Sequence, residues 1–226
     1  VEFYDPATRK RFERSNSDII SKFQEITNIE ERRYVKPEQV TSDIATLAAR
    51  EAIESSGYDP EKLDFILVAH NFGDMSLENC HIDLCPGLSF RVKSKLQIKN
   101  SNVLCHDVIA GCPGWTTAMI LADAYIKSGT FKSGLVIGSD VISRIADPYD
   151  RDRMIFSDGA GAVIVEAMES EKPVGIISHS SRSDFDHGML KVAPSVNPDY
   201  SIGDFKLKMQ GSKVYAYALS NVPAVV

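Results

Sequence analysis

One cysteine occupies a position suited to nucleophilic chemistry. Cys112 follows an apolar run and the small-residue turn Ala110-Gly111, and it precedes a segment with helical apolar spacing. The first turn of a helix has unpaired N–H groups and the positive end of the dipole, which stabilise a thiolate over a thiol. The same N–H groups can hold an oxyanion. This position predicts a covalent acyl acceptor, with an ordinary buried cysteine as the alternative.

Other groups that could do chemistry are less suggestive. Five cysteine and histidine residues are candidate zinc ligands: Cys80, His81, Cys85, Cys105 and His106. Their spacing does not fit the common zinc-binding patterns. We therefore predict no metal and no cofactor. His106 lies six residues before Cys112, and we interpret it as a strand histidine rather than a pairing base.

The run Asp158-Gly159-Ala160-Gly161-Ala162 has neither the spacing nor the strand-to-helix context of a phosphate-binding loop. We expect it to form a tight turn that leads into a strand, with the glycines allowing close backbone packing.

Alternating helices and strands must position Cys112. Helical spacing and capping residues predict helices over residues 41–57, 88–96, 115–128 and 211–226. Short apolar runs predict buried strands over residues 63–70, 102–108, 135–140, 162–167 and 174–181, with an irregular segment over 183–205. This order predicts an α/β fold with a mixed, mostly parallel sheet covered by helices.

Composition limits the classes of partner. The chain has 226 residues, 43% of them hydrophobic, and a formal net charge of −6. A folded core is expected, and the acidic balance argues against nucleic-acid and anionic-membrane surfaces. No apolar run is long enough to span a bilayer, and residues 1–12 lack the apolar region of a signal peptide, so we expect a cytoplasmic protein.

Six blocks along the chain, in order, resemble the 3-oxoacyl-acyl-carrier-protein synthase III family of the thiolase superfamily. They are Ile29-Glu30-Glu31-Arg32-Arg33, the segment from Cys112-Pro113-Gly114-Trp115 to Lys127-Ser128-Gly129, Gly138-Ser139-Asp140, Asp147-Pro148-Tyr149-Asp150-Arg151, Phe156-Ser157-Asp158-Gly159-Ala160-Gly161-Ala162, and Met209-Gln210-Gly211. The resemblance implies a thiolase-like fold. Residues 1–170 would form a first half that carries the nucleophile, and residues 171–226 would begin a second, incomplete half.

In that family the cysteine takes an acyl group from acyl-CoA or acyl carrier protein, and decarboxylation of malonyl-acyl carrier protein yields the carbanion that attacks it. The resemblance thus assigns Cys112 as nucleophile and Arg151, Phe156 and Met209 as substrate-binding residues, with Arg151 packing on adenine. It also implies acyl carrier protein and acyl-CoA as partners, and a homodimer joined through the strand at residues 102–108.

The sequence departs from the family in two places. Shortly before the block that starts at Ile29, acetyl-CoA users carry a tryptophan and an arginine that hold adenine, and this chain has neither residue at those places. The donor is therefore left open between a longer acyl-CoA and an acyl carrier protein. The family's catalytic histidine and asparagine follow the Met-x-Gly helix, inside which this sequence ends. Two alternatives stay open: a cysteine thioesterase or acyl-hydrolase, and a catalytically incomplete fragment that only dimerises.

Overall fold

The computed structural model describes residues 2–78, 81–186, 188–199 and 204–225. The chain divides into two compact units that are interleaved in sequence. Unit 1 comprises residues 1–33, 145–157 and 180–226, and unit 2 comprises residues 34–144 and 158–179. The predicted division at residue 170 concerns two halves of a thiolase-like fold, and it stays a prediction.

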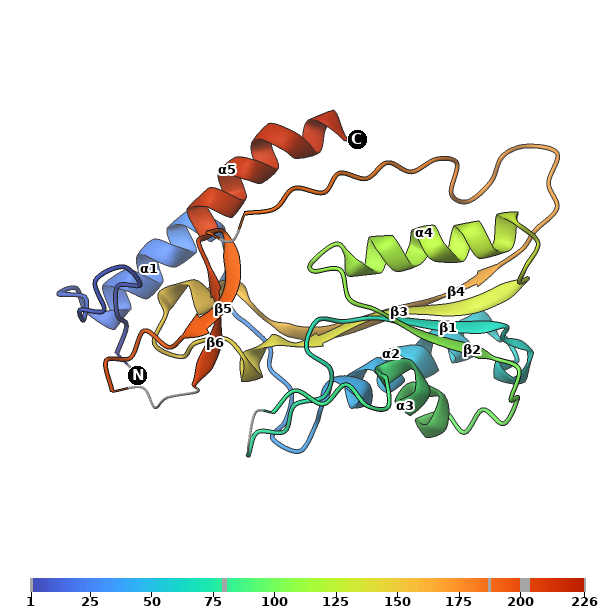
Figure 1. The fold of residues 1–226 in the computed structure, drawn as a ribbon, viewed down its shortest axis with the longest axis horizontal. Coiled ribbons are helices and arrows are strands. Elements are labelled where there is room, and N and C mark those ends of the chain that lie inside the picture. The colour runs from blue at the N-terminus through green and yellow to red at the C-terminus, as the bar shows by residue number, and fades with distance from the viewer. Residues whose placement is uncertain (1, 79–80, 187, 200–203, 226) are drawn as a thin grey trace. The chain divides into compact units, whose positions relative to one another are not determined.

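Unit 2 is a four-stranded sheet between helices. Its strand order is β2-β1-β3-β4, in which β1 (Phe65–Ala69) pairs in parallel with β2 (Leu104–Val108) and β3 (Ser133–Val141), and β4 (Asp158–Glu166) runs antiparallel to β3. Helices α2 (Thr41–Ser56) and α3 (Leu88–Lys95) cover one face and α4 (Gly114–Lys127) covers the other (Figure 1). The predicted mixed, mostly parallel sheet is confirmed.

Strand alternation divides the core of unit 2 into two layers. Ile66 and Val68 pack against α2 and α3, whereas Phe65, Leu67 and Ala69 pack against α4. Since β1 is buried on both faces, its continuous apolar run is the expected pattern for a central parallel strand. Gly134 lies beside Phe65 in the neighbouring strand, and a Cβ there would come within 2.0 Å of the Phe65 ring.

Unit 1 contains α1 (Asn16–Thr27), the short helix η3 (Arg151–Ile155), the antiparallel pair β5 (Leu190–Pro194) and β6 (Phe205–Met209), and α5 (Gly211–Asn221). Ser15 caps α1 by accepting a hydrogen bond from the Asp18 N–H at 3.2 Å. A hairpin over residues 3–12, bridged at Tyr4 and Arg11, also belongs to this unit.

Three expectations about the chain after residue 157 are wrong. The run Asp158 to Ala162 is part of β4 and not a turn, because it pairs along its length with β3; at Gly159 and Gly161 nothing lies close enough to contact an added Cβ. Residues 174–181 form no strand, since this segment pairs with no other strand in the described chain. The segment 183–205 is not irregular throughout, since β5 lies within it and finds its partner in β6.

Candidate active site

Cys112 lies exposed in the connection between β2 and α4. Gly111 adopts the left-handed conformation with φ +69°, which a glycine tolerates without strain, and the Gly114 N–H closes the turn on the Gly111 carbonyl at 3.0 Å. Pro113 is the N-cap and Gly114 the first helical residue. The structure therefore places Cys112 at the helix mouth, as the sequence predicts.

The backbone around Cys112 offers free hydrogen-bond donors. The N–H groups of Cys112, Trp115 and Thr116 have no acceptor in the described part of the chain, and the first helical bond runs from the Thr117 N–H to the Pro113 carbonyl at 3.0 Å. Such groups, together with the helix dipole, favour negative charge at this end of α4. This arrangement can hold an anionic oxygen beside the Cys112 thiol.

Close packing seats the start of α4 on the sheet. A Cβ added to Gly114 would lie 3.4 Å from the Cβ of Ala69 on β1. A Cβ added to Gly138 on β3 would lie 3.2 Å from Trp115, so the indole packs directly over that glycine. Small residues on both sides therefore fix the position of the helix end that carries Cys112.

A buried histidine–aspartate pair lies on the opposite side of β2. His70 Nε2 and Asp107 Oδ2 are 3.0 Å apart, and His70 Nδ1 accepts the Gly73 N–H at 3.2 Å, so Nε2 carries the proton. Asp107 also accepts from the N–H groups of Leu88 and Ser89, at 2.6 and 2.8 Å, and thereby caps α3. Both ring nitrogens of His70 are thus engaged in contacts with neighbouring groups.

Burial acts to raise the pKa of Asp107. The hydrogen bonds from His70 and from the N–H groups of Ser89 and Leu88 outweigh this effect and lower that pKa from 3.8 to about 2. The carboxylate is therefore ionised across the physiological range. The His106 side chain on β2 is exposed and makes no hydrogen bond within the described residues, so the structure does not pair it with Cys112.

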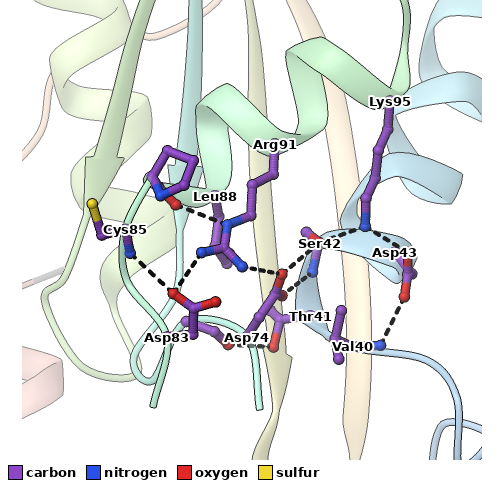
Figure 2. A network of polar contacts seen from close by, with 12 residues as sticks. Val40, Thr41, Ser42, Asp43, Asp74, Asp83, Cys85, Leu88, Arg91 and Lys95 are labelled. Atoms are coloured by element: carbon purple, nitrogen blue, oxygen red, sulfur yellow. Dashed lines mark hydrogen bonds and ion pairs between the residues drawn. The ribbon is translucent and has the colours of Figure 1, made fainter. Parts of the chain in front are cut away.

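A network of charged groups holds the loop before α3 (Figure 2). Asp74 accepts the N–H and the hydroxyl of Ser42, both at 2.7 Å, and so caps α2 from outside the helix. Arg91 on α3 donates to Asp74 at 2.8 Å and to Asp83 at 2.7 Å. Backbone bonds between Asp74 and Asp83, at 3.0 and 2.9 Å, close the base of this loop.

The three predicted substrate-binding residues all lie in unit 1, and Cys112 lies in unit 2. Arg151 begins η3 and is half-exposed, with its guanidinium 4.9 Å from the centre of the Phe12 ring. Phe156 caps the end of η3 and is partly buried. Met209 ends β6, and its methyl group lies close to Gly211. Their roles stay predictions.

Buried charges anchor the loop that carries Arg151. Asp147 accepts from the Val196 N–H at 2.7 Å and contacts the Lys208 ammonium, which also lies 3.7 Å from Asp150. Burial acts to raise the pKa of Asp147, but Lys208 and the backbone donors outweigh it and lower that pKa. For Asp150, burial prevails and the pKa is raised.

Sequence reasoning missed Phe12 and the hairpin that carries it. The charged residues of the run from Arg9 to Arg14 are exposed. Phe12 within that run, however, contacts Arg151 across the unit. No sequence motif near Phe12 indicates this contact, because Phe12 and Arg151 are far apart in the chain.

The described residues contain no group of three His, Cys, Asp or Glu side chains that could hold a metal ion. Cys80, one of the candidate zinc ligands in the sequence, lies outside the described residues. No helix in the described ranges has the length and apolar character needed to cross a bilayer.

Residues 106–184 match the family model described as 3-Oxoacyl-[acyl-carrier-protein (ACP)] synthase III. Over 221 residues the chain is 36% identical to the beta-ketoacyl-[acyl-carrier-protein] synthase III of Salmonella arizonae. The alignment covers 96% of this chain and 63% of that relative. The chain is similar to the 3-oxoacyl-[acyl-carrier-protein] synthase III family along almost its whole length. It spans about 63% of the length of this curated relative.

Two solved structures have a similar fold. The priming beta-ketosynthase of the R1128 polyketide pathway is 26% identical with a TM-score of 0.76, over 94% of this chain and 64% of that one. The synthase III of Aquifex aeolicus VF5 is 27% identical with a TM-score of 0.64, over 90% of this chain and 62% of that one. The fold of this chain is therefore thiolase-like, as predicted.

Proposed function

We propose that this chain is part of a condensing acyltransferase of fatty-acid or related biosynthesis, and that Cys112 is its acyl acceptor. The observation that carries the proposal is the exposed Cys112 thiol at the mouth of α4, beside backbone N–H groups that find no acceptor among the described residues. Similarity to the synthase III family supports the same reaction class.

In the proposed first step, the Cys112 sulfur attacks the carbonyl carbon of an acyl thioester. A bond forms between sulfur and the acyl carbon, the carbon–sulfur bond to the carrier breaks, and the carrier leaves as a thiolate that takes up a proton. The N–H of Cys112 is the donor for the oxyanion that forms between these events. Covalent capture divides the condensation into two easier steps.

In the proposed second step, malonyl-acyl carrier protein loses carbon dioxide, and the resulting carbanion attacks the acyl carbon on Cys112. A carbon–carbon bond forms, the bond to the Cys112 sulfur breaks, and a 3-oxoacyl carrier protein leaves. Acyl-CoA or acyl carrier protein would supply the acyl group. Arg151, Phe156 and Met209 are proposed to contact these substrates.

A homodimer and a cytoplasmic location belong to the same proposal. Among the described strands β2 lies at the edge of its sheet, with a neighbour only on the β1 side, and an open edge favours pairing with another strand. The described cysteines Cys85, Cys105 and Cys112 are free thiols, which suits a reducing compartment.

The test is to supply the chain with an acyl thioester and malonyl-acyl carrier protein. The proposal predicts transfer of the acyl group to the chain, lost in Cys112→Ala, and release of carbon dioxide with a 3-oxoacyl product would in addition exclude a catalytically incomplete fragment. Consumption of the thioester with free fatty acid as the only product, unaffected by malonyl-acyl carrier protein, would instead support the acyl-hydrolase.

A further inference from the structure

Two residues that follow β1 are held by carboxylates from both neighbouring strands. His70 contacts Asp107 on β2 at 3.0 Å, and its N–H donates to the Val108 carbonyl at 3.1 Å. On the other side, the Asn71 N–H donates to Oδ1 of Asp140 on β3 at 2.9 Å, and the Asn71 side-chain amide donates to Oδ2 at 2.7 Å. The segment that leaves β1 is therefore tied to both β2 and β3.

The Asp140 side chain replaces the main-chain ladder at the end of β1. The pairing of β1 with β3 ends where Ala69 lies opposite Gly138, two residues before Asn71 and Asp140. The Asn71 N–H therefore has a carboxylate as its acceptor in place of a carbonyl of β3. Both Asp140 oxygens accept from this one residue, so the contact fixes direction as well as position.

The Asn71–Asp140 pair lies on the face of the sheet that carries α4. Gly138 belongs to that face, because a Cβ added there would lie 3.2 Å from Trp115 in the first turn of α4. Side chains two residues apart on a strand share a face, so Asp140 lies on the same side of β3. Cys112 precedes the first turn of α4, so the pair and Cys112 share this side of the sheet.

Residues 69–71 hold both ends of the turn that carries Cys112. Val108, at the start of the turn, accepts the N–H of the middle residue of this segment. Gly114, at the end of the turn, packs so closely on Ala69 that an added Cβ would lie 3.4 Å from the Ala69 Cβ. A shift of this short segment would therefore displace the turn at both of its ends.

We propose that Asn71 and Asp140 are positioning residues for Cys112. Their two hydrogen bonds hold residues 69–71, and this segment holds the Cys112 sulfur beside the N–H groups at the mouth of α4 that find no acceptor among the described residues. The inference rests on the proposed function, because it assigns a support to the nucleophile of that reaction.

Alkylation of Cys112 by a neutral and by an anionic reagent tests this inference without any substrate. Unpaired N–H groups and the helix dipole favour an anion. The rate with iodoacetate relative to the rate with iodoacetamide should therefore be higher at Cys112 than for N-acetylcysteinamide in solution. The ratio compares two reagents at one thiolate, so the fraction of thiolate cancels. Mapping of the modified peptides assigns the rates to Cys112.

Two single changes and their combination test the named residues. Asn71→Asp sets two carboxylates against each other, and Asp140→Asn sets two amides against each other. Each should lower the ratio at Cys112 by about three- to fivefold, the effect of a charge at a helix end. The double change restores a carboxylate–amide pair and should return the ratio to within about 1.5-fold of the unaltered chain. Asn71→Ala, which removes only the side-chain donor, should also lower the ratio and replaces a single variant that fails to fold.

The signs of the two single effects separate positioning from an effect of charge alone. Asn71→Asp adds a negative charge and Asp140→Asn removes one, so charge alone would move the ratio in opposite directions. Ser139→Ala is the matched control. It removes the hydrogen bond from the Ser139 hydroxyl to the Thr41 carbonyl, at 3.1 Å on the other face of β3, and should leave the ratio unchanged.

Opposite shifts in the two single variants, no shift in either, or a double variant as low as the single ones would overturn the inference. An equal fall in Ser139→Ala, or a ratio in the unaltered chain no higher than for the free thiol, would overturn it as well. Acylation of Cys112 with a ratio that these changes do not move sinks only this inference. A ratio that follows the predicted pattern without acylation sinks only the proposed function.

Discussion

Asp107 connects three structural elements at the carboxyl end of the unit 2 sheet. It lies on β2, accepts the first N–H groups of α3 and pairs with His70, which follows β1. Cys112 comes five residues later on the same segment, and the His70 N–H holds that segment through the Val108 carbonyl at 3.1 Å. The Asp107 carboxylate therefore fixes the strand end from which the Cys112 turn departs.

Replacing Asp107 by Asn should lower the free energy of unfolding by about 1–2 kcal/mol at pH 7, after allowance for solvent screening. The folded-state pKa is about 2 against 3.8 for an unperturbed Asp, so this contribution is complete above 3.8 and is lost as the pH falls towards 2. Urea unfolding at pH 7 and at pH 3 measures it. An equal difference between the proteins at both pH values would contradict this account.

For single residues, the sequence predicted where a residue lies along its element better than it predicted which other residues it contacts. A small-residue turn before an apolar helix is a local pattern, so the placement of Cys112 could be predicted. The His70–Asp107 and Phe12–Arg151 contacts join residues from separate elements, so no local sequence pattern predicts them.

Helix α2 begins without a side-chain cap of its own. Its N-cap is Val40, which has no side-chain acceptor, and Asp74 from the following loop takes that role for Ser42. Asp43 partly compensates by accepting the Val40 N–H at 2.9 Å. One buried carboxylate therefore joins α2 to Arg91 on α3 (Figure 2).

Asp74→Ala should destabilise unit 2 by about 2–4 kcal/mol, because it removes a helix cap and leaves the Arg91 guanidinium without a buried partner. Asp83→Ala is the matched control: it removes the other Arg91 carboxylate, whose side chain is 56% exposed, and should cost much less. Chemical denaturation of both variants measures the difference. Equal losses would show that Asp74 has no special role.

Pairing partners explain which elements could be predicted. The helices and strands from residue 41 to residue 141 bury apolar faces against sequence neighbours, and their patterns predict them well. The segment 174–181 has a strand-like composition but no strand beside it in the described chain. The glycine-rich start of β4 resembles a turn, and only its long register with β3 makes it a strand.

The units of the whole molecule are interleaved, so no single cut in the sequence separates them. Within unit 2 the sheet is covered on both faces, but β2 leaves one edge open and Leu104 on that strand is 38% exposed. An open parallel-sheet edge with an exposed apolar residue favours association with a second copy.

We therefore expect a dimer at micromolar concentration in sedimentation velocity experiments. Leu104→Lys places a charge on the open edge and should shift the protein towards the monomer with its circular dichroism spectrum unchanged. Val174→Lys, which alters an exposed apolar residue away from β2, is the control and should remain dimeric. A monomeric unaltered protein would contradict the proposed dimer.

Intact-mass measurement after incubation with acyl-CoA or acyl-acyl carrier protein tests the central claim most directly. The account predicts a mass increase of one acyl group, mapped to Cys112, absent in Cys112→Ala and retained in Cys85→Ala and Cys105→Ala. The absence of an adduct from either donor, or an adduct that persists in Cys112→Ala, would contradict it.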